Sequence, residues 1–211
     1  DSCELLGPFA LLVQALMGIL ALSSLVWKRS KEYPNRRPWK VWLFDVSKQV
    51  LGAFGIHMLN VFMRTGLPPD SKPRLPIDDG VDNPCDYYFL NILFDTTIGI
   101  PILWAVLYMV FNLARRAGIE GIVSGEYGSP PKYSYYSKQL GLYFVGLLSM
   151  KLIIYIMLIY CPFLVKFANW MLHWSDSSPN FQVGLVVFIF PLIMNTFQYY
   201  VIDNIIQSPE Y

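Results

Sequence analysis

Long apolar stretches separated by short polar segments recur along the chain. A bilayer hydrocarbon core of about 30 Å is crossed by about 20 helical residues. Stretches of about that length lie at residues 7–27, 41–63, 88–113, 139–163 and 181–206. The pattern therefore predicts an all-α, polytopic membrane helix bundle with about five transmembrane helices.

Composition agrees with one membrane domain over residues 1–211. Hydrophobic residues make up 55% of the chain and charged residues only 15%, against about a quarter charged in typical soluble domains. The net charge is +1, and the basic residues form no single large face, which argues against a nucleic-acid partner. The expected surroundings are the lipid bilayer and other membrane proteins.

Basic residues in the connecting segments predict the orientation, because cytosolic loops retain Lys and Arg. One side carries most of them, and the other carries only Arg64, Lys72, Arg74 and Lys166. The rich side has Lys28, Arg29, Lys31, Arg36, Arg37, Lys40, Arg115, Arg116, Lys132 and Lys138. We predict a lumenal N-terminus and a cytosolic C-terminus.

Two cysteines, Cys3 and Cys85, each precede a predicted span on the lumenal side. Thiols in an oxidising compartment favour a disulfide between them, and two unpaired thiols are the alternative. The loop between spans two and three is acidic, but its carboxylates lack ordered calcium-ligand spacing, so we interpret it as a solvated loop.

Polar side chains inside the predicted spans are the main functional candidates. Ionisable groups cost about 2.5 to 3.5 kcal/mol on insertion scales and normally face the protein interior. Counting from the span ends at about 1.5 Å per residue places Asp95 and Lys151 at a similar depth, so we predict that they pair. The full set is Asp45, Lys48, Gln49, His57, Asn60, Asp95, Lys151, Asn195, Asp203 and Asn204.

A second group is expected nearer the cytosol, from Asp45, Lys48 and Asp203. Two interpretations of the buried polar residues remain open. They are either structural contacts between helices or a site for a substrate, an ion or a lipid headgroup. No metal-ligand spacing, nucleophile elbow or P-loop is present, so we predict no cofactor or metal, and an enzyme is the less favoured class.

Two cytosolic segments are candidates for contact with anionic lipids or with a protein partner. The first is a polybasic turn that contains Arg36, Arg37, Trp39 and Lys40. Such turns either bind anionic headgroups or only set the topology. The second is an irregular, Gly-rich and Pro-rich turn that contains Glu126 and Tyr127.

The chain resembles the STIMATE family, which is catalogued in fungi as vacuolar membrane proteins. The resemblance extends over nearly the whole chain. It is carried by Arg36-Arg37-Pro38-Trp39-Lys40-Val41-Trp42, Asp45-Val46-Ser47-Lys48-Gln49, His57, Asn60, Asn83-Pro84-Cys85, residues 95–99, Gly125-Glu126-Tyr127-Gly128 and Asp203-Asn204.

The resemblance implies a multi-pass protein of the endoplasmic reticulum or vacuole. Animal members regulate store-operated calcium entry through the STIM calcium sensor and continue into a long charged tail, whereas this sequence stops at Tyr211. The first hypothesis is therefore a non-enzymatic regulator of calcium handling or membrane contacts that acts through protein partners. The alternative is a small transporter, channel or lipid-binding protein that uses the buried Asp, Lys and His residues.

Overall fold

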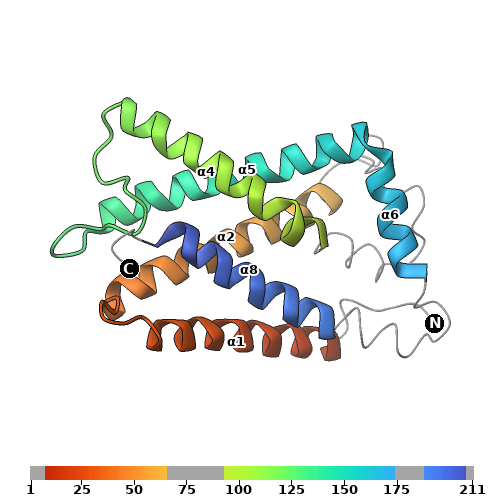
Figure 1. Ribbon diagram of the computed structural model, residues 1–211, viewed down its shortest axis with the longest axis horizontal. Coiled ribbons are helices and arrows are strands. Elements are labelled where there is room, and N and C mark those ends of the chain that lie inside the picture. The colour runs from red at the N-terminus through yellow and green to blue at the C-terminus, as the bar shows by residue number, and fades with distance from the viewer. Residues whose placement is uncertain (1–7, 66–92, 174–187, 208–211) are drawn as a thin grey trace.

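A computed structural model describes residues 8–65, 93–173 and 188–207, and the regular secondary structure in these ranges is helical. The long helices lie side by side, and α6 turns away from the end of α5 (Figure 1). This confirms the all-α prediction. The helices are α1 (Pro8–Ser30), α2 (Trp39–Thr65), α4 (Gly99–Arg116), α5 (Tyr133–Tyr160), α6 (Pro162–His173) and α8 (Phe190–Ile206).

Five helix ends meet at one end of the bundle. There α1, α4 and α8 finish, while α2 and α5 begin (Figure 1). We refer to this end as the charged end, because the segments that join these helices carry many of the basic residues. Segments distant in the sequence are thereby brought close together.

The helices overlap the predicted spans, although α4 begins only at Gly99 and α5 already at Tyr133. The number of spans stays a prediction. The segment 41–63 lies wholly inside α2, and α1 covers nearly all of 7–27. Among the described residues, α5 is the one helix that is both long enough and apolar enough to cross a membrane. The described part of α8 has 17 residues, which is short of the about 20 that a span requires.

One predicted boundary is wrong. The fourth apolar stretch was expected to run as one helix to residue 163, but α5 ends at Tyr160 and α6 starts at Pro162. Proline disfavours the helical region for the residue before it, and Cys161 has φ −123° and ψ 72°. The chain therefore bends at Cys161 within an apolar stretch that hydropathy alone shows as continuous.

The larger hydrophobic core lies where α5 packs against α4. Leu103 and Leu107 of α4 contact a cluster that includes Leu147 and Met150 of α5. Gly146 allows this close approach, since a Cβ built there would lie 2.4 Å from the Leu107 side chain. A smaller core of Leu25, Trp42 and Val46 joins α1 to α2.

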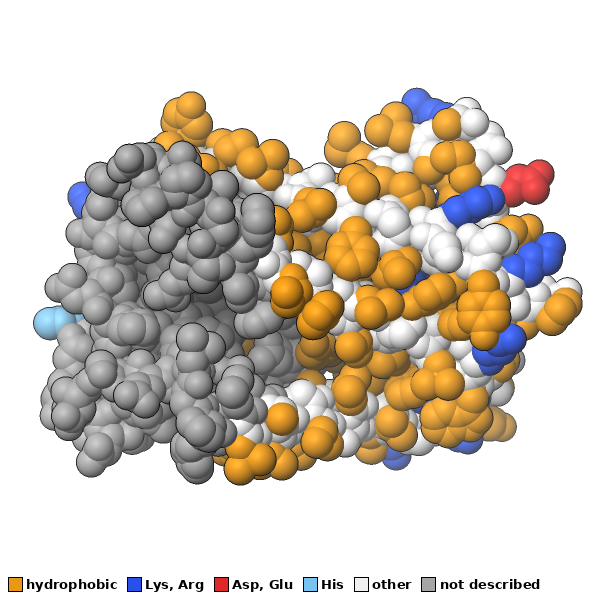
Figure 2. All heavy atoms as spheres, turned by 180° about the vertical axis from the view of Figure 1, so that it is seen from behind, with side chains coloured by type: hydrophobic (Ala, Val, Ile, Leu, Met, Phe, Trp, Pro, Cys, Tyr) orange, Lys and Arg blue, Asp and Glu red, His pale blue; other side chains and the backbone are white. Residues whose placement is uncertain are grey.

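The outer faces of the helices are strongly apolar. Many hydrophobic side chains lie on the described part of the surface that Figure 2 shows. An apolar surface of this extent is normally covered by lipid or by another protein. Examples from four helices are Leu16, Ile19, Trp104, Tyr108, Leu148, Leu152, Ile193 and Phe197.

The predicted disulfide cannot be compared with this structure, because Cys3 and Cys85 lie outside the described residues. The acidic loop between α2 and α4 also lies outside them. The side chains of His57 and Asn60, although these residues belong to α2, are likewise outside the description. The disulfide, the solvated loop and the roles of His57 and Asn60 therefore remain predictions.

Candidate functional site

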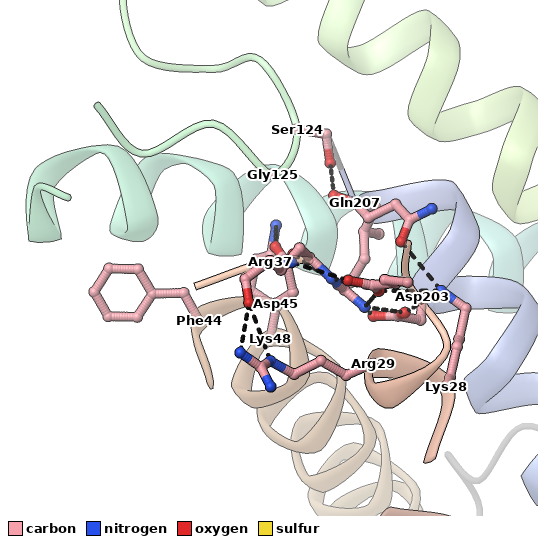
Figure 3. Close-up of polar contacts among 12 residues, drawn as sticks. Lys28, Arg29, Arg37, Phe44, Asp45, Lys48, Ser124, Gly125, Asp203 and Gln207 are labelled. Carbon is pink, nitrogen blue, oxygen red and sulfur yellow. Dashed lines mark hydrogen bonds and ion pairs between the residues drawn. The ribbon is translucent and has the colours of Figure 1, made fainter. Parts of the chain in front are cut away.

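Arg37 is the centre of a buried ion-pair network at the charged end. It lies in the segment between α1 and α2, and its side chain is fully buried. Its guanidinium donates two parallel hydrogen bonds to Asp203, at 3.0 and 2.7 Å, and one to Asp45 at 3.0 Å. Its Nε donates to Glu32 at 2.9 Å. One guanidinium therefore connects three carboxylates from three segments. Figure 3 shows Arg37 with two of them, Asp45 and Asp203.

The charge of Arg37 is well stabilised. Burial by itself would lower the pKa of Arg37, but hydrogen bonds to Asp203 and Glu32 outweigh burial and raise it above its ordinary value. The backbone carbonyl of Arg37 accepts two hydrogen bonds from Arg29, at 3.0 and 2.7 Å. The turn between α1 and α2 is thus held from both its backbone and its side chain.

Asp45 joins the network to the segment between α4 and α5. The phenol of Tyr127 donates a short hydrogen bond to Asp45, and the ammonium of Lys48 lies 3.6 Å from the same carboxylate oxygen. Burial, followed by the neighbouring Asp45 charge, raises the pKa of the Tyr127 phenol. The phenol therefore remains a neutral donor.

Asp203 joins the network to α1. Lys28 donates to Asp203 at 2.6 Å and to Gln207 at 3.1 Å. Asp203 itself is fully buried. The last turns of α1 and α8 are therefore locked together through charged hydrogen bonds, the stronger class of protein hydrogen bonds.

Gln139 at the start of α5 organises the turn before it. Its carbonyl accepts from Lys48 at 3.2 Å and from the backbone N–H of Gly125 at 3.1 Å. Its amide donates to the carbonyls of Gly121 and Glu126, at 3.2 and 2.8 Å. All four hydrogen-bonding positions of this amide are thus used, three to fix the segment between α4 and α5 and one to bind Lys48 of α2.

Two glycines give that segment its shape. Gly125 and Gly128 have φ of 80° and 89°, a region that residues with a Cβ rarely adopt. They flank Tyr127, whose ring is buried against Phe44 at a centroid distance of 4.9 Å. The Gly125-Glu126-Tyr127-Gly128 motif therefore has a structural role, which is to insert a tyrosine above Asp45.

The predicted pair of Asp95 and Lys151 is confirmed. The Lys151 ammonium donates to Asp95 at 2.5 Å, and both side chains are 21% exposed. The predicted second group is also confirmed, because Arg37 links Asp45 to Asp203 and Lys48 lies beside Asp45. Among the described residues, no ion pair joins Asp95 or Lys151 to the Arg37 network, and the membrane depth of the two sets stays a prediction.

The remaining candidate residues differ in how deeply they are buried. Gln49 is buried, and neither amide atom has a hydrogen-bond partner in the part of the chain that the structure describes. Asn195 is half-buried. Asn204 was expected among the buried polar residues, but it is exposed, since it is rotated by about 100° around α8 from the adjacent Asp203.

Of the residues predicted to contact lipid or a partner, some are exposed and others are buried. Arg36, Trp39, Lys40 and Glu126 are exposed, as a contact surface requires. Arg37 and Tyr127, which were expected to contact lipid or a partner, are buried at 0% and 2% exposure. The physical reason is that buried Asp45 and Asp203 need a cation and a donor, and these two side chains turn inward to supply them.

Sequence reasoning missed several members of the network. Lys28, Arg29 and Glu32 were grouped with the topology-setting residues of the turn or passed over, and Gln139 and Gln207 were not identified. A signal was present for Lys28 and Glu32, whose spacing of four places them on one helical face. The other residues carry no local pattern, because their partners are distant in sequence.

Comparisons with known proteins identify the family of the chain. The model of the STIMATE family matches residues 85–208. A vacuolar membrane protein of Saccharomyces cerevisiae is 43% identical over 225 residues, which cover 98% of this chain and 80% of that protein. No solved structure matches. With a family match over more than half of its length and this degree of identity, the chain belongs to the STIMATE family.

Proposed function

We propose that this chain is an integral protein of the vacuolar or endoplasmic reticulum membrane that regulates calcium handling or membrane contacts through protein partners, without catalysing a reaction. The vacuolar membrane relative supports the location. The apolar outer faces of the helices support embedding in a bilayer. The N-terminus is lumenal in this proposal, and the charged end faces the cytosol.

The observation that carries the proposal is that the buried charges at the charged end satisfy one another. Asp45, Asp203 and Glu32 each lie within 3.0 Å of an Arg37 nitrogen. Carboxylates paired in this way are poorly placed to bind a solute or to transfer a proton. Their main effect is to fix the relative positions of the segments that form the cytosolic face.

Exposed residues on that rigid face supply the contact surface. Arg36 and Lys40 are exposed basic residues, Trp39 is 55% exposed, and Glu126 is exposed on the neighbouring segment. Arg and Trp are common anchors of protein interfaces. A partner would therefore recognise a fixed surface of mixed charge with one aromatic side chain.

The test is a calcium measurement in cells that lack the endogenous protein. We expect the charge reversals Arg36→Glu with Lys40→Glu to abolish the rescue of organellar calcium release, while the protein accumulates normally in its membrane. The matched control is Arg115→Glu with Arg116→Glu, exposed basic residues at the end of α4. Full rescue by the first variant would contradict a partner surface at Arg36 and Lys40.

A second candidate function, transport of a small polar solute or ion, is favoured by one observation. Gln49 is buried in α2, and neither of its amide atoms has a partner among the described residues. Buried amides are normally hydrogen-bonded, so a solute or water beside Gln49 would satisfy it. Flux assays on liposomes containing the purified protein and a Gln49→Leu variant would detect such transport, and equal flux in both would exclude Gln49.

A further inference from the structure

A polar pocket lies beside the ion-pair network at the charged end. It has a volume of about 320 Å³ and opens between the last turn of α1, the turn that follows it, and the last turns of α8. Ammonium, amide and phenol groups dominate its wall. The lining residues are Lys28, Lys31, Glu32, Tyr33, Pro34, Asn35, Tyr200, Asn204 and Gln207.

The groups available in this pocket suit an anion that also carries hydroxyls. Lys28 has three N–H donors, of which Asp203 and Gln207 take two. Lys31 is exposed and adds a second ammonium. The carboxylate of Glu32 is occupied by Arg37 at 2.6 Å, so its charge is largely compensated. Amides such as Asn204 can both donate to and accept from hydroxyl groups.

An apolar groove continues from the same pocket along α8. It has a volume of about 530 Å³ and is lined by Leu192, Ile193, Thr196, Phe197 and Tyr200. Ile193, Phe197 and Tyr200 are spaced by four and three residues, so they form one stripe of the helix. The stripe is about 10 Å long at about 1.5 Å per residue. Tyr200 lines both the groove and the polar pocket.

We propose that this pocket and groove together bind one phospholipid with an anionic headgroup. The phosphate contacts Lys28 and Lys31, the headgroup hydroxyls contact Asn204 and Gln207, and an acyl chain lies along Ile193 and Phe197. The charged end is rich in Lys and Arg, which attract anionic lipids. Binding of this lipid would add a contact between α1 and α8 beside the Lys28–Asp203 ion pair.

Lipid binding at this pocket rests on one part of the proposed function, namely that the chain is embedded in a membrane. It requires no protein partner and no role in calcium handling. The variant with Arg36→Glu and Lys40→Glu is therefore expected to bind this lipid normally even if it fails to restore calcium release. Loss of lipid binding, in turn, can be measured in purified protein with no partner present. The calcium measurement therefore tests the partner surface, and the lipid-binding measurement tests the pocket.

The test is native mass spectrometry of the full chain in mild detergent, titrated with dioleoylphosphatidylglycerol, an anionic lipid whose headgroup carries two hydroxyls. Dioleoylphosphatidylcholine is the neutral comparison, and inorganic phosphate is the soluble anion. We expect preferential binding of the anionic lipid and about fivefold weaker binding after Lys31→Ala, the change equivalent to one lysine near a membrane surface. Lys132→Ala, which removes an exposed lysine outside the pocket, is the matched control.

A groove-filling variant separates the lipid from a free anion. Thr196→Trp places a large side chain in the groove and should weaken binding of the anionic lipid, while any binding of inorganic phosphate is unchanged. Phe197→Ala, which shortens the groove wall, gives a second measurement in the event that Thr196→Trp does not fold. The proposal is overturned if Lys31→Ala and Lys132→Ala weaken binding equally, if both groove variants bind lipid normally, or if phosphate displaces the lipid completely.

Discussion

Arg37 and Asp203 stand 166 positions apart in the sequence, yet they form two parallel hydrogen bonds of 3.0 and 2.7 Å inside the bundle. This fork geometry is specific to the planar guanidinium. It closes the last turn of α8 onto the turn between α1 and α2. The charged end is therefore held by one buried pair with the remaining members arranged around it.

Replacement of Arg37 should be severely destabilising. Arg37→Ala leaves Asp45, Asp203 and Glu32 without their shared cation, and removal of one partner from a buried ion pair costs about 3 to 5 kcal/mol. Arg36→Ala, at an adjacent exposed position, should change stability by less than about 0.5 kcal/mol. Thermal unfolding of both proteins in the same detergent checks this, and similar unfolding temperatures would contradict a central role for Arg37.

Loss of the Tyr127 hydroxyl should have a smaller effect. Tyr127→Phe keeps the ring against Phe44 but removes one donor to the buried Asp45 carboxylate. A hydrogen bond to a charged group contributes about 1.5 to 3 kcal/mol, so we expect a loss in that range. Tyr133→Phe is the control, because Tyr133 also contacts Phe44 but is 68% exposed. Equal stability of the two variants in chemical denaturation would refute the assignment.

The pair of Asp95 and Lys151 should show strong coupling. Asp95→Leu or Lys151→Met alone leaves one ionisable group without its partner 2.5 Å away, whereas the double variant replaces both with apolar groups, a change that proteins often tolerate. We expect each single variant to unfold at a lower temperature than the double variant. A double-mutant cycle measures this coupling, and additive effects would show that the pair contributes little. A stable double variant that fails to rescue calcium release would indicate a functional site.

Two glycines of α5 should respond oppositely to the same substitution. Gly146→Ala places a Cβ 2.4 Å from the Leu107 side chain, so α4 and α5 must separate or Leu107 must move. Gly141→Ala meets nothing within 4 Å and should stabilise the helix by about 0.5 to 1 kcal/mol. Thermal unfolding of the two variants gives the comparison. Stabilisation by both would mean that α4 lies further from α5 than the structure places it.

The sequence by itself determined the helical class, the approximate position of each long helix and the pairing of Asp95 with Lys151. These follow from local rules, since apolar stretches of bilayer length favour helices and residue counting predicts which polar side chains lie at similar positions along neighbouring helices. Motifs such as Asp45-Val46-Ser47-Lys48-Gln49 also identified the family. Hydropathy did not show the bend at Cys161, where one proline ends α5.

Only the tertiary structure decided how the charged end is built. In the sequence, Arg37 is one basic residue of a polybasic turn beside Arg36, and Tyr127 is one of several tyrosines near an expected interface. The folded chain buries Arg37 and leaves Arg36 exposed, because Asp203 and Asp45 meet at that point and a buried carboxylate requires a cation or a donor. No local sequence pattern predicts that Asp45 and Asp203 lie close together, since this depends on the relative positions of the end of α1, the start of α2 and the end of α8.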